Sequence, residues 1–144
     1  YCNNAQATGI LQHSQQICIT QVTRDGSEVR IKLRIDNLND ETMWLQCGAT
    51  NAGVFCLDLN RSKYDAKSVI GTTSFRLNPR GTNFIEWVFE VPDRNIDFLN
   101  LHMHVVGTIG GNCRGDADVV FRDIPLFKSK RPIEDRLGES RGIG

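Results

Sequence analysis

The 144-residue sequence lacks the features that mark several functional classes. Seventeen basic residues are balanced by seventeen acidic ones, so the whole chain exerts no net attraction on nucleic acid or an anionic membrane. No apolar run is long enough to span a bilayer. The sequence has no Cys-x-x-Cys pair, no Gly-x-Ser-x-Gly and no phosphate-binding glycine loop. We therefore expect neither an enzyme nor a cofactor.

Helical periodicity is also missing between residues 10 and 126, and strand-like alternation takes its place. Residues 29–36 alternate apolar and charged side chains at every position. Because successive side chains on a strand point to opposite faces, one face of this segment is predicted to be core. The predicted core residues are Val29, Ile31, Leu33 and Ile35.

Turn signals recur about every ten residues, a spacing typical of a sandwich or barrel. Strands are predicted near residues 15–23, 28–37, 42–48, 53–59, 68–76, 83–92, 98–108 and 117–124. Asp25-Gly26 predicts a type I′ hairpin turn, and residues 58–67 are the one candidate for a short helical turn. The fold class that follows is all-β: an antiparallel sandwich of about seven or eight strands with an extended C-terminal tail.

Several segments together resemble a known family of domains. They are Ile35-Asp36-Asn37, Ile70-Gly71, residues 77–81, residues 87–92 and Val119-Val120-Phe121. Their order is similar to that in the immunoglobulin-like sandwich domains of bacterial envelope lipoproteins. The resemblance implies an immunoglobulin-like fold and an extracytoplasmic location in the periplasm or cell envelope, and it assigns no catalytic residue. Membrane association would then be indirect or through a lipid at Cys2, which stays open.

Five cysteines cannot all pair within one chain. In an oxidising compartment four would pair, and the predicted pair is Cys47 with Cys56, because these flank a turn and could face each other across a hairpin. The alternative is that all five are buried, reduced thiols.

Two clusters on predicted strands could carry chemistry. Arg30, Lys32 and Arg34 form a basic row on the exposed face of residues 29–36, which suits a ligand or nucleic acid but also suits a protected edge strand. His102 and His104 point the same way from another strand, where a metal would need a further ligand. We expect both histidines to face solvent and no metal to bind.

The chain divides into an N-terminal arm (1–14), the sandwich (15–126) and a basic, glycine-containing tail (127–144). The tail carries five basic and three acidic side chains, a net charge of +2. Charge can steer a docking segment while apolar residues fix its register. The predicted partner-binding residues are Lys128, Lys130, Arg131, Ile133, Leu137 and Arg141.

The sequence thus predicts a non-enzymatic structural or interaction subunit of a multiprotein cell-envelope assembly, such as a secretion or surface complex. Its partners would be other protein subunits, bound through the tail and a sheet edge. The alternative is a ligand- or nucleic-acid-binding module that uses the basic row.

Overall fold

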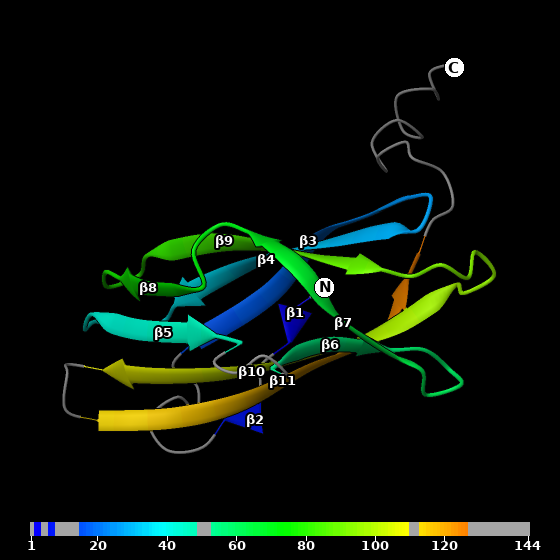
Figure 1. Cartoon of the computed structure of the whole chain (residues 1–144). Helices are drawn as coiled ribbons and strands as arrows, with labels where there is room; N and C mark the ends of the chain where they lie inside the picture. The colour runs from blue at the N-terminus through cyan, green and yellow to red at the C-terminus, as the bar shows by residue number, and fades with distance from the viewer. Residues whose placement is uncertain (1, 4–5, 8–14, 49–52, 110–112, 127–144) are drawn as a thin grey trace.

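The computed structural model describes residues 2–3, 6–7, 15–48, 53–109 and 113–126 (Figure 1). Every regular element in this part of the chain is a β-strand, so no helix there could cross a membrane. The strands are β1 (Cys2–Asn3), β2 (Gln6–Ala7), β3 (Gln15–Asp25), β4 (Glu28–Asn37), β5 (Met43–Cys47), β6 (Val54–Leu57), β7 (Lys63–Ile70), β8 (Ser74–Leu77), β9 (Thr82–Glu90), β10 (Phe98–Ile109) and β11 (Cys113–Pro125).

The strands form two antiparallel layers (Figure 1). The first sheet has the order β1-β3-β4-β9-β7. In the second sheet β2, β11 and β10 are neighbours, and β5 and β6 follow each other along the far side of β10. β8 pairs with β5, while the start of β7 pairs with β6. β7 therefore leaves the second sheet and continues into the first, which closes one side of the sandwich.

The core lies between the inner faces of the two sheets, as the alternation predicts. Val29, Ile31, Leu33 and Ile35 are all fully buried. They pack in one cluster with residues of the second sheet such as Leu101, which is equally buried. Burying one such side chain contributes about 1.5–3 kcal/mol to stability, so this cluster is the main support of the fold.

Two details of the predicted strands differ in the structure. Residues 68–76 do not form one strand, because Gly71 separates β7 from β8 with a φ of 109°. A Cβ there would also lie 2.9 Å from the carbonyl oxygen of Phe84. The hairpin turn between β3 and β4 has a positive φ at Gly26 but not at Ser27, the pattern of type II′ rather than type I′.

The prediction of a helical turn within residues 58–67 is wrong. The side chain of Asp58 closes a tight loop instead, since its Oδ1 accepts hydrogen bonds from the backbone N–H of Asn60 (2.8 Å) and of Ser62 (2.9 Å). Its Oδ2 accepts a bond of 2.8 Å from the Tyr64 hydroxyl. Desolvation raises the pKa of the Asp58 carboxyl, but these bonds outweigh it and hold the pKa below its usual value. Burial and the bond to Asp58 raise the pKa of Tyr64 to about 12.

Buried polar side chains join loops that are distant in sequence. Asn37 is 1% exposed, and its Nδ2 donates to the carbonyls of Glu41, Leu77 and Asn78. This amide ties the end of β4 to the turn between β8 and β9, so the two sheets are fixed to each other at this end of the sandwich.

Candidate interaction surface

The outer face of the second sheet carries an exposed tryptophan. In β5, Met43, Leu45 and Cys47 are buried, whereas Trp44 and Gln46 are exposed. The strict alternation puts Trp44 on the solvent side, where half of its surface (50%) is accessible. An indole of this size left half in water on the flat of a sheet is a candidate contact point for a partner.

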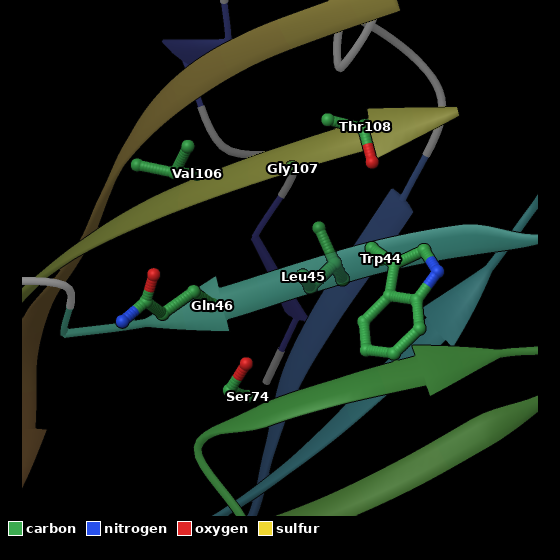
Figure 2. A pocket seen from close by; sticks show the side chains of 7 residues that line it. All are labelled: Trp44, Leu45, Gln46, Ser74, Val106, Gly107 and Thr108. Atoms are coloured by element: carbon green, nitrogen blue, oxygen red, sulfur yellow. The ribbon is translucent and has the colours of Figure 1, made fainter. Parts of the chain in front are cut away.

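Trp44 lines a groove between β5, β8 and β10, which we call the Trp44 groove (Figure 2). Its volume is about 250 Å³. Trp44 and Val106 supply apolar surface, and uncharged polar groups lie at its margins. Figure 2 shows the side chains coming from three neighbouring strands; the lining residues are Trp44, Leu45, Gln46, Ser74, Val106, Gly107 and Thr108.

A cation lies beside this groove. Arg76 of β8 is directly opposite Trp44 in the β5–β8 ladder, and its guanidinium carbon is 6.0 Å from the centroid of the Trp44 ring. That is the range of a cation–π contact. Within the described ranges, no carboxylate forms an ion pair with Arg76. The groove therefore combines an apolar surface with a positive charge that no carboxylate of the described residues neutralises.

His102 and His104 lie farther along the same outer face, as expected, because Leu101, Met103 and Val105 point inward and are buried. The sequence reasoning thus placed both histidines on the correct side of the strand.

The two imidazoles have different partners. Nδ1 of His104 is 2.7 Å from Oδ1 of Asp118, and the ring of His102 stacks on Phe55 with centroids 4.8 Å apart. On the Phe55 ring, the Lys63 ammonium lies 4.6 Å from the centroid. Desolvation, and after it the charge of Arg122, lowers the pKa of His102.

A second pocket of about 220 Å³ is bordered by Phe55, His102, His104 and Asp118. In the part of the chain that the structure describes, no three His, Cys, Asp or Glu residues are grouped so as to hold a metal ion. The imidazole of His104 contacts the carboxylate of Asp118, whereas that of His102 stacks on the ring of Phe55.

The basic row lies on the outer face of the first sheet and is matched by acidic neighbours. Nε of Arg30 is 2.8 Å from Glu28, and its Nη1 is 3.5 Å from Glu86. The hydrogen bond to Glu28 raises the pKa of Arg30.

The other two members of the row are also engaged. Arg34 pairs with Asp36 at 3.1 Å. The ammonium of Lys32 lies 5.4 Å from the centroid of the exposed Phe84 ring. Because carboxylates of β4 and the neighbouring β9 offset the charges of Arg30 and Arg34, the row offers little net positive potential to a phosphate backbone.

The predicted disulfide between Cys47 and Cys56 is wrong, because both are free, buried thiols. β5 and β6 do not form a hairpin but lie end to end beside β10, where Cys47 is opposite Val105 and Cys56 is opposite Leu101. Four residues of strand separate those positions by about 13 Å, whereas bridged cysteines have Cα atoms within about 7 Å.

β5 and β6 are two separate strands that pair with β10 one after the other, which keeps the two thiols apart. The N–H of Gly48 donates to the carbonyl of His104 (2.8 Å), and the N–H of His104 donates to the carbonyl of Gly53 (2.9 Å). Gly48 and Gly53 thus both bond to His104 of β10. Burial raises the pKa of Cys47 to about 12 and raises that of Cys56 further.

A disulfide is present elsewhere, at Cys18 of β3. In the register of β1 with β3, the Cα of Cys2 is paired with that of Cys18. The sequence signal for the pairing of β1 with β3 was weak, because the two strands lie in different predicted segments, the N-terminal arm and the first strand.

The tail residues predicted to bind a partner lie outside the described residues. They are Lys128, Lys130, Arg131, Ile133, Leu137 and Arg141. Their role stays a prediction.

Sequence reasoning missed the Trp44 groove. The available signal was the alternation Met43-Trp44-Leu45-Gln46-Cys47, which puts a tryptophan on the polar face of a strand. The nearby Arg76 could not be associated with it, because the pairing of β5 with β8 follows from the tertiary fold.

Comparisons with known proteins establish the fold class. No family model matches the sequence, and no curated protein matches it either. Among solved structures, the GAE domain of yeast GGA1 is similar to this chain at 12% identity, covering 78% of this chain and 93% of that one, with a TM-score of 0.55. The GAE domain of GGA2p from Saccharomyces cerevisiae is similar at 14% identity, covering 83% and 98%, with a TM-score of 0.53.

At this level of identity the likeness concerns the fold alone. Together with the two antiparallel layers, it defines the chain as an all-β protein with an immunoglobulin-like sandwich. This confirms the predicted fold class and the immunoglobulin-like part of the family resemblance.

Proposed function

We propose that this chain is a non-enzymatic interaction subunit of a multiprotein assembly in the cell envelope, such as a secretion or surface complex. The observation that carries the proposal is the Trp44 groove, where a half-exposed indole lies beside a cation that has no acidic partner among the described residues. Tryptophan and arginine are the residues that most often dominate protein–protein interfaces.

The disulfide at Cys18 supports a location outside the cytoplasm. Disulfides persist in the periplasm and other oxidising compartments and are rare where thiols are kept reduced. The test is to alkylate the protein in intact cells and map the labelled cysteines without a reductant. Cys18 should stay unlabelled, and labelling of Cys18 in cells would contradict an extracytoplasmic location.

The tail supplies a second contact in this proposal. Its basic residues would steer it toward an acidic partner surface, and Ile133 and Leu137 would anchor it. Deleting residues 128–144 should abolish co-purification with partners from envelope fractions and leave the melting temperature of the sandwich unchanged. Deleting residues 142–144 alone is the matched control and should preserve co-purification. Equal recovery of partners with both deletions would contradict tail docking.

A further inference from the structure

We propose that the Trp44 groove binds an extended segment of a partner protein in which a large apolar side chain is next to a carboxylate. This inference deepens the proposed function and rests on it, because it assigns the chemistry of the bound partner to one face of the sandwich.

The size of the groove favours a single side chain as its occupant. About 250 Å³ is smaller than the roughly 300–1,000 Å³ of sites that enclose a cofactor or other small ligand. Trp44 and Val106 offer apolar surface from adjacent strands (Figure 2). An apolar side chain placed between them would remove from water much of the half-exposed indole, which is the main energetic gain available here.

The charge beside the groove favours a carboxylate next to that side chain. Arg76 is held against the Trp44 ring at 6.0 Å, so its guanidinium is already oriented before binding. A carboxylate of the partner could form with Arg76 the ion pair that no described residue forms. A lysine at the same place in the partner would be repelled.

The arrangement of strands favours an extended segment. β8 has only four residues, and β5 is the one described strand that pairs with it. An extended peptide places alternate side chains on one face, so it can insert its apolar residue and direct its backbone to the polar margin. Gln46, Ser74 and Thr108 supply uncharged donors and acceptors at that margin.

The experiment uses two fluorescein-labelled heptapeptides, Gly-Ser-Asp-Phe-Asp-Ser-Gly and the same peptide with lysine in place of both aspartates. Fluorescence anisotropy with the full chain should show binding of the acidic peptide alone. Trp44→Ala should weaken this binding by roughly tenfold or more, as expected at a contact hot spot. Arg76→Glu should reverse the preference between the two peptides, a result that a loss of folding cannot produce.

Phe84→Ala is the matched control, because Phe84 is 49% exposed but lies on the other sheet. Binding should be unchanged in this variant. Equal affinity for the two peptides, no binding of the acidic peptide at millimolar concentration, or full binding by Trp44→Ala would overturn the proposal. So would a dimer that forms in the wild type and is lost in Trp44→Ala, because the occupant would then be a second copy of this chain.

The tail deletion separates this inference from the proposed function. If the chain lacking residues 128–144 binds the acidic peptide but recovers no partners, the groove assignment and the proposed interaction function are both supported. If the full chain recovers partners but binds no acidic peptide, the groove assignment fails and the interaction function stands.

Discussion

Arg24 is a buried arginine that holds a whole loop, and its removal is the sharpest test of how the sandwich is stabilised. The side chain is 3% exposed at the end of β3. Its Nη2 donates to the carbonyls of Val91 (2.9 Å) and Asp93 (3.0 Å), and its Nη1 donates to that of Ile96 (3.0 Å). Its Nε donates to the carbonyl of Gly26 at 3.0 Å. One guanidinium thus fastens the loop between β9 and β10 to the hairpin of β3 and β4.

The cost of replacing Arg24 by methionine follows from these four bonds. Methionine keeps most of the apolar stem, so the change chiefly removes donors. The carbonyl of Val91 is buried and would lose its donor, which costs about 1–3 kcal/mol. The other three carbonyls are partly buried and can turn to water, with a smaller loss each. We expect a total loss of about 3 kcal/mol, which corresponds to a fall in melting temperature of roughly 10 °C.

Urea unfolding, followed by the fluorescence of the buried Trp87, measures the loss directly. Arg94→Met is the control, because Arg94 lies in the same loop but is exposed, and it should change stability by less than about 0.5 kcal/mol. Arg24→Lys should not restore stability, since an ammonium lacks the planar fork that reaches four carbonyls. If Arg24→Met is as stable as Arg94→Met, the bonds of Arg24 do not hold the loop.

Three further predictions address other buried groups. Asn37→Ala should cost about 2–3 kcal/mol in urea unfolding, because three carbonyls lose a shared amide donor; an unchanged midpoint would contradict this. The pKa of Asp58 is lower in the folded protein than in the unfolded one. The ionised carboxylate therefore stabilises the fold fully above the unfolded-state pKa, and this stabilisation is lost as the pH falls through the folded-state pKa. Asp58→Asn should therefore flatten the fall in stability below about pH 4, and an unaltered acid limb would count against the role of Asp58. Iodoacetamide should label Cys47 and Cys56 only after unfolding, because burial keeps them protonated; mass spectrometry showing label on the native protein would refute their burial.

The parts of the fold that could be predicted from sequence are those set by local alternation. Residues 29–36 have one possible orientation in a sheet with one face exposed to solvent, because a shift by one residue would bury every charge. The same rule placed His102 and His104 on the outer face of β10, with their apolar neighbours inward.

The parts that could not be predicted depend on pairings between distant strands. β7 changes sheets near Ala66, since its first residues pair with β6 and its last with β9. The alternation of side chains along β7 does not indicate that the strand passes from one sheet to the other. The disulfide prediction failed for the same reason, because Cys47 and Cys56 lie on two strands that both pair with β10, one after the other.

The two outer faces of the sandwich differ in whether their arginines have carboxylate partners among the described residues. This difference indicates where partner proteins bind. On the first sheet, Arg30 and Arg34 each have a carboxylate of the same sheet within 3.1 Å, so both guanidinium charges are already paired. On the second sheet, Arg76 has an aromatic ring as its described contact, and that ring is half in water. Binding gains most where an apolar surface is still to be buried and a charge still lacks an opposite one. The Trp44 groove meets both conditions, whereas Arg30 and Arg34 already have carboxylate partners, so a loss of partner binding should follow changes at Trp44 and Arg76 and not changes at Arg30 or Arg34.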